Sequence, residues 1–65
     1  MDMRKIGFKA KVSRLEHSKT QKEIAADLGY SSENIAAFEQ GRNNNAHILL
    51  YYMSKFGFNP MEVRE

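Results

Sequence analysis

Residues 20–42 read TQKEIAADLGYSSENIAAFEQGR, and this stretch decides the fold. It holds two segments with helical apolar spacing, separated by about three residues around Gly29. Glycine accepts the left-handed backbone conformation that commonly follows the last turn of a helix. The spacing therefore predicts two helices, over 21–28 and 32–40, joined by the short turn typical of a helix-turn-helix.

Capping signals support both helix starts. Thr20 and Glu23 match the T-x-x-E capping box, in which each side chain bonds a free backbone N–H of the first turn. Ser31 or Ser32 can cap the second helix in the same way. Small Ala25 falls where two helices of such a pair must approach closely. The first helix is thus expected to begin at about residue 21 and the second at about residue 32.

Apolar periodicity continues outside this stretch. Phe8, Val12 and Leu15 recur at i, i+4 and i+7, and predict the buried face of a preceding helix. No segment alternates apolar and polar residues as a strand would. We therefore predict an all-α, compact five-helix fold forming a single domain over residues 1–65. Its other three helices are expected over 4–17, 46–56 and 60–64.

Composition narrows the classes of function. The chain has 65 residues and no cysteine, so disulfides and thiolate metal sites are excluded. His17 and His47 lie far apart without a carboxylate at metal-ligand spacing. We expect no metal, no cofactor and no enzymatic activity. No apolar stretch is long enough for a signal peptide or a membrane span, so a cytoplasmic protein without membrane contact is expected.

Charge is unevenly distributed along the chain. The net charge is +2, but residues 1–22 hold seven basic and two acidic residues. The remainder holds three basic and six acidic residues. A polyanion could bind the basic end, although a simply solvated helix face would show the same pattern.

The spacing of several residues resembles a known family. The segment from Gln21 to Arg42 fits Q-x-x-x-A-x-x-x-G followed by I-x-x-x-E-x-G-[KR], the pattern of the helix-turn-helix in the Cro and phage-repressor (Xre-type) family. The similarity covers about residues 5–63. It implies a lambda-repressor-like fold that binds DNA. The scaffold residues that carry it are Gln21, Ala25, Gly29, Ile35, Glu39 and Gly41.

The resemblance also implies where bases would be read. In this family the first turn and outer face of the second motif helix enter the major groove. Serine, glutamate and asparagine side chains can bond base edges there, and alanine can contact a thymine methyl. This face lacks Arg and Lys, and a glutamate would repel phosphates, so readout is expected to be limited or to rely on DNA shape. The candidate base-contacting residues are Ser31, Ser32, Glu33, Asn34 and Ala37.

Phosphate contacts are implied at both ends of the motif. Family members use the glutamine that opens the first motif helix, and the segment after the second, to hold the DNA backbone. The alternatives are that Thr20 alone caps the helix and that the asparagines only form a turn. The candidate phosphate-contacting residues are Lys19, Gln21, Lys22, Gln40, Arg42, Asn43 and Asn44.

Two further sets of residues have non-catalytic roles. The resemblance pairs Arg14 with Glu39 in a partly buried structural ion pair. Apolar residues near the C-terminus exceed what a domain this small is expected to bury, and an exposed apolar patch commonly marks a partner site. A fully packed monomer core is the alternative. The candidate dimer or partner surface contains Leu50, Tyr51, Phe58, Met61 and Val63.

Together these features predict a sequence-specific DNA-binding transcriptional regulator. A repressor of the kind that phages and mobile elements encode is expected, bound as a homodimer to a palindromic operator in double-stranded DNA. The alternative is a helix-turn-helix protein-interaction module, such as an antirepressor or co-regulator, that binds another regulator instead of DNA.

Overall fold

The computed structural model describes residues 2–62, and all regular structure in them is helical. The α-helix expected over 60–64 is corrected in its described part, because residues 60–62 form a 3-10 turn, and residues 63 and 64 lie outside the described residues. Four α-helices and that turn follow one another as α1 (Met3–Glu16), α2 (Gln21–Leu28), α3 (Ser32–Glu39), α4 (Ala46–Phe56) and the 3-10 turn Pro60–Glu62.

Each α-helix begins at a residue whose side chain caps it. The caps accept hydrogen bonds from backbone N–H groups of the first turn that have no partner inside the helix. Two helices, α2 and α4, end at Gly29 and Gly57, both in the left-handed conformation. These local signals account for all four helix starts and for the ends of α2 and α4. The four caps are Asp2, Thr20, Ser31 and Asn45.

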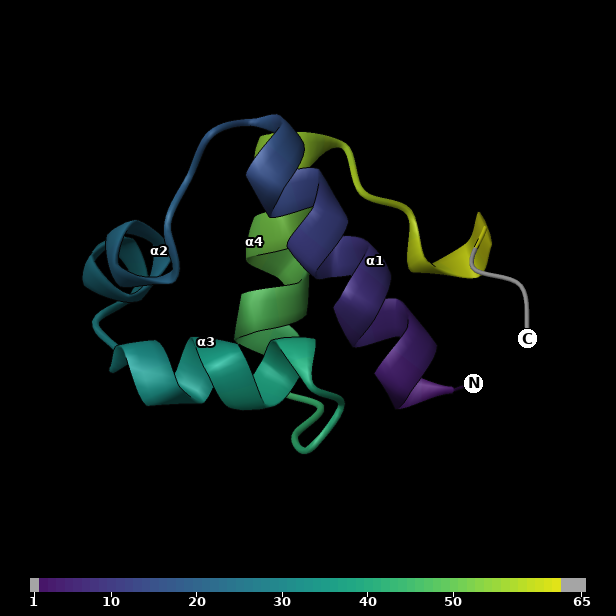
Figure 1. Cartoon of the computed structure of the whole chain (residues 1–65), viewed down its shortest axis with the longest axis horizontal. Coiled ribbons are helices and arrows are strands. Elements are labelled where there is room, and N and C mark those ends of the chain that lie inside the picture. The colour runs from purple at the N-terminus through teal and green to yellow at the C-terminus, as the bar shows by residue number, and fades with distance from the viewer. Residues whose placement is uncertain (1, 63–65) are drawn as a thin grey trace.

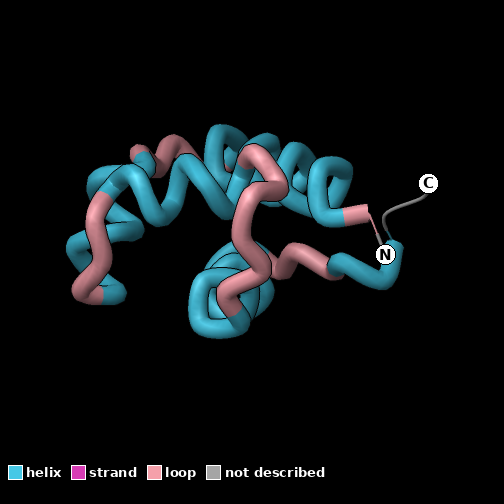
Figure 2. The backbone as a smooth tube through the Cα atoms, turned by 90° about the horizontal axis from the view of Figure 1, so that it is seen from below, coloured by secondary structure: helices cyan, strands magenta, loops and turns pink. Residues whose placement is uncertain are grey.

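The helices pack in pairs. In Figure 1, α1 runs obliquely beside α3, while α2 is viewed nearly end-on beyond the start of α3. The packed pairs are α1 with α3, α1 with α4, and α2 with α3. Seen from below, α4 is nearly end-on and lies to one side of the other three helices, joined to α3 by the Gly41–Asn45 loop (Figure 2). In Figure 1 no helix lies below α3, and this side is referred to as its uncovered side.

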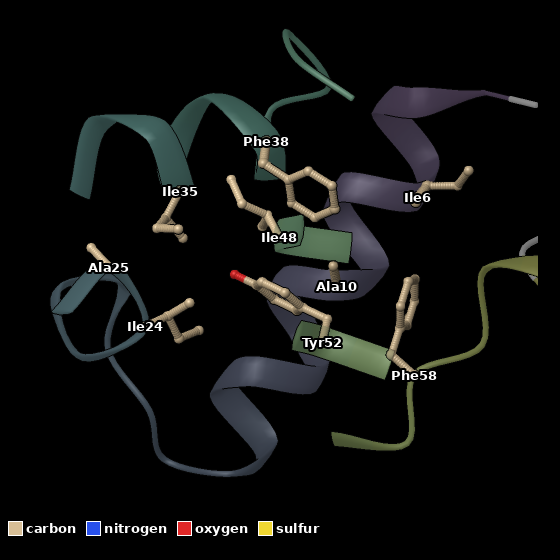
Figure 3. Packing of buried hydrophobic residues seen from close by; sticks show 9 residues of the cluster. All are labelled: Ile6, Ala10, Ile24, Ala25, Ile35, Phe38, Ile48, Tyr52 and Phe58. Carbon is tan, nitrogen blue, oxygen red and sulfur yellow. The ribbon is translucent and has the colours of Figure 1, made fainter. Parts of the chain in front are cut away.

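The core draws side chains from every α-helix (Figure 3). Tyr52 lies at its centre, and its ring centroid is 5.5 Å from that of Phe38. Branched apolar side chains surround this aromatic pair, and aromatic pairs of this kind add to the stability gained from buried area. The buried apolar residues are Ile6, Ala10, Ile24, Ala25, Ile35, Phe38, Ile48, Tyr52 and Phe58.

The face of α1 that is buried differs from the predicted one. Phe8 and Leu15 were expected in the core, but they are 58% and 55% exposed. The helix instead packs through Ile6, Gly7 and Ala10. A Cβ at Gly7 would lie 2.5 Å from the carbonyl oxygens that end α3, so only glycine permits this approach. Close backbone packing, and not apolar volume, therefore selects the buried face of α1.

Candidate nucleic-acid interface

Two capping boxes fix the geometry of the α2–α3 unit, residues 20–39. At the start of α2, the Thr20 hydroxyl accepts from the Glu23 N–H at 3.1 Å, and the Glu23 carboxylate accepts from the Thr20 N–H at 3.0 Å. Gly29 ends α2 with φ +75°, and α3 follows after two residues. At Ser31 a second reciprocal box forms with Asn34. The turn is thus bounded by the C-cap Gly29 and the N-cap Ser31, and α2 packs against α3.

A buried network around Glu39 ties this unit to the rest of the molecule. Its carboxylate accepts two hydrogen bonds from Arg14, at 2.7 and 3.1 Å, in the predicted pairing. It also accepts from the Gln21 amide at 2.9 Å and from the Tyr52 hydroxyl. Arg14 in turn donates to the Lys19 carbonyl at 2.8 Å. One carboxylate thus joins α1, α2, α3 and α4.

The charges in this network stabilise one another. The hydrogen bond from Arg14 to Glu39 raises the pKa of the guanidinium, although burial opposes this effect. Burial, and then the bond to Glu39, raises the pKa of Tyr52 well above its usual value, so the hydroxyl stays protonated and donates. Every buried side-chain nitrogen and oxygen in residues 2–62 has a hydrogen-bond partner. The network is therefore complete and can hold Gln21 in place.

The structure divides the five candidate base-contacting residues. Ser31 and Asn34 use their side chains on each other, since the Ser31 hydroxyl also donates to Asn34 Oδ1 at 3.0 Å. Both would have to open the cap before contacting a base through these atoms. Glu33 is exposed, whereas Ser32 and Ala37 are half-buried. The uncovered side of α3 therefore presents one exposed carboxylate and small side chains.

A basic groove lies where the end of α1 meets the starts of α2 and α3. It is a shallow, open depression of about 740 Å³ and includes Ser32 at the first turn of α3. Lys19 and Lys22 are exposed at its rim, and Lys19 Nζ lies 3.8 Å from the Glu23 carboxylate. None of the described residues that line it is acidic. Its basic lining residues are Lys11, Arg14, Lys19 and Lys22.

Gln21 lies between this groove and a second one. The second groove encloses about 330 Å³ between α1 and α3 and is also lined by Arg4, Lys11 and Gln40. The predicted phosphate contact of Gln21 has a competing use here, because its amide nitrogen already donates to Glu39. Sequence reasoning missed Arg4 and Lys11 as members of this surface. Their spacing of seven residues, which places them on one face of α1, was the available signal.

The segment after α3 holds the remaining phosphate candidates. Arg42 and Gln40 are exposed and joined by a hydrogen bond of 2.8 Å. Asn43 is half-buried and closes the loop, since its side chain accepts from the Asn45 N–H and donates to the Asn34 carbonyl. Asn44 is exposed. Asn43 therefore has the turn-forming role that was the alternative to a phosphate contact. The side chains of Gln40, Arg42 and Asn44 are exposed to solvent.

The predicted apolar partner surface is only partly present. Leu50 and Met61 are exposed, at 57% and 77%. Phe58 is buried at 8% exposure, so it belongs to the core and not to a surface. Tyr51 is half-buried and donates to Asp27 at 2.6 Å. Val63 lies outside the described residues.

Two other kinds of feature are absent from residues 2–62. This part of the chain holds no cluster of three or more side chains arranged to bind a metal. It also has no helix with the length and apolar character needed to cross a bilayer. Comparison with family models, with curated proteins and with solved structures finds no match to this chain.

Proposed function

We propose that this chain is a sequence-specific DNA-binding transcriptional regulator of the Cro and phage-repressor type, and that the α2–α3 unit is its helix-turn-helix. The observation that carries the proposal is the basic groove at the start of the unit. Lysines there flank the first turn of α3, the part of a recognition helix that contacts base edges. In this proposal α3 docks its uncovered side in the major groove.

Phosphate contacts supply most of the binding energy in the proposed complex. Lys19, Lys22 and Gln21 hold the DNA backbone at one end of α3, while Gln40, Arg42 and Asn44 reach it at the other. Ser32, Glu33 and Ala37 face the base edges. Because this face has no cation, sequence preference comes from a few polar contacts and from DNA shape.

Repression would follow from occupying a promoter, as in regulators that phages and mobile elements encode. A homodimer would place two α3 helices about 34 Å apart, one turn of DNA, on a palindromic operator. Leu50 and Met61 are the exposed members, among the described residues, of the surface proposed for self-association.

A second candidate is a protein-interaction module that uses the same fold to bind another regulator. The exposed Glu33 carboxylate on α3 favours it, because an acidic face disfavours phosphates. The α2–α3 unit would then contact a basic partner surface instead of DNA.

Selection from a pool of random duplexes separates the two candidates. The regulator predicts enrichment of one site, with dyad symmetry if the chain binds as a dimer. Glu33→Gln should change the preferred bases while retaining binding. Circular dichroism first shows that the protein is folded. If the folded protein then recovers duplexes without enriching any site, sequence-specific binding is refuted.

A further inference from the structure

Two exposed apolar side chains mark a stripe along α1. Arg4, Phe8, Lys11 and Leu15 recur at i, i+4, i+7 and i+11, so they share one face of the helix. Phe8 and Leu15 expose more than half of their surface, although both are large and apolar. The face of α1 that packs on α3 and α4 does not include these two side chains. This face of α1 therefore lacks a partner within residues 2–62.

The stripe borders both grooves of the candidate interface. Phe8 lines the groove between α1 and α3, and Leu15 lines the basic groove. Lys11 and Gln21 line both, so the two grooves form one continuous surface along α1. The single carboxylate among the lining residues, Glu39, is buried and paired with Arg14. Along α1 the surface thus alternates basic and apolar side chains, and it has no free carboxylate among its lining residues.

This combination selects the chemistry of its occupant. DNA phosphates can pair with the lysines, but they make no favourable contact with the apolar side chains of Phe8 and Leu15. A partner that carries apolar side chains between carboxylates satisfies both features. Residues seven apart on an α-helix lie about 10.5 Å apart along its axis, so Phe8 and Leu15 match two apolar residues at i and i+7 of a partner helix.

We propose that an acidic amphipathic helix of a regulatory protein docks along the α1 stripe and displaces DNA. Its apolar residues cover Phe8 and Leu15, and its carboxylates pair with Arg4, Lys11 and Lys19. The bound helix also covers Gln21, which lies in both grooves. The competition with DNA rests on the proposed function, whereas the docking site itself does not.

A peptide selection tests the docking site. Random displayed peptides of about 15 residues, enough for four helical turns, are selected on the wild-type protein. Counter-selection uses the double variant Phe8→Ser/Leu15→Ser. We expect enriched peptides that are acidic and carry apolar residues at i and i+7. Their affinity should fall at least tenfold in the double variant. Met53→Ser, at an exposed apolar residue of α4 outside both grooves, should change it less than twofold.

The folding control is the thermal midpoint, which should be retained because both substituted side chains are exposed. Enriched peptides that bind the double variant unchanged, or a selection without acidic peptides, would overturn the proposal. A double variant that loses self-association in sedimentation would assign the stripe to a second copy of the chain instead. If the selection enriches no peptide and the double variant loses duplex binding, the stripe belongs to the DNA contact.

Competition is measured with a labelled duplex recovered from the random-duplex selection. The proposal predicts that a selected peptide displaces this duplex from the wild-type protein. Simultaneous binding of peptide and duplex would refute the competition. If the wild-type protein binds the peptides through Phe8 but binds no duplex, the DNA-binding proposal fails and the docking site stands.

Discussion

Glu39 is the residue on which the α2–α3 unit depends most. Its side chain is 2% exposed and accepts hydrogen bonds from three other helices. A buried charge is costly unless it is paired and hydrogen-bonded, and removing one partner leaves the other uncompensated. The loss of Glu39 would strand the Arg14 guanidinium and release Gln21 from its position beside the grooves.

We therefore expect Glu39→Ala to lower the free energy of unfolding by about 3–5 kcal/mol, the usual cost of breaking a buried pair. The matched change, Glu33→Ala, removes an exposed carboxylate from the same helix and should stay within about 0.5 kcal/mol. Urea unfolding followed by circular dichroism measures both. The reverse order of stabilities would contradict the role assigned to Glu39.

Tyr51 makes stability sensitive to alkaline pH. Burial, together with the hydrogen bond to Asp27, raises its pKa to about 12. A pKa raised on folding gives stability that is fully present below the unfolded pKa, near 10, and is lost as pH rises towards 12. Tyr52 contributes in the same direction.

The free energy of unfolding should therefore fall above about pH 10, with the larger part of the fall from buried Tyr52 and a smaller part, reduced by solvent screening, from Tyr51. In Tyr51→Phe the fall should be smaller, because one of the two shifted groups is gone. Unfolding curves at about pH 9 and pH 11 make the comparison. An equal fall in both proteins would show that Tyr51 does not titrate with folding.

Among the elements, α2 and α3 were the most predictable from sequence. Their starts depend on side chains within three residues, Thr20 with Glu23 and Ser31 with Asn34, and such local bonds are legible in sequence. The buried face of α1 was not predictable in this way. Apolar spacing favoured Phe8 and Leu15, but the buried face of α1 includes Gly7, which lies against the end of α3, and Ala10, and hydrophobic patterns undervalue both small residues.

Gly7 provides a test of that helix contact. Glycine inside a helix costs about 1 kcal/mol relative to alanine, so Gly7→Ala would stabilise α1 in isolation. In the folded protein the new Cβ would meet the carbonyl oxygens of Phe38 and Glu39, so the helices must separate. We expect a net loss of about 1–3 kcal/mol, the usual cost of overpacking.

Urea unfolding of Gly7→Ala and of Ala26→Gly gives the comparison. Ala26 is exposed in α2, so its substitution reports helix propensity alone, about 1 kcal/mol of destabilisation. A more stable Gly7→Ala protein would mean that α1 does not approach the end of α3 as closely as the structure shows.

At the scale of the whole molecule, the fold brings basic residues that are separate in the sequence together on one surface. The excess of basic residues in the first third was evident, yet it did not reveal which lysines share a surface. That depends on how α1 crosses the α2–α3 unit, which brings Lys11 beside Gln21. Similarly, Phe58 entered the core because the chain after α4 folds back, a contact that its local sequence does not encode.

The central claim is that duplex DNA binds through the basic groove, and the salt dependence of binding tests it most directly. For the selected duplex, the slope of log affinity against log salt concentration counts the phosphates neutralised. We predict that Lys19→Gln/Lys22→Gln reduces that slope by about 0.9 for each lysine that contacts a phosphate, whereas Lys55→Gln on α4 leaves it unchanged. A slope that the Lys19/Lys22 variant does not alter would contradict the claim.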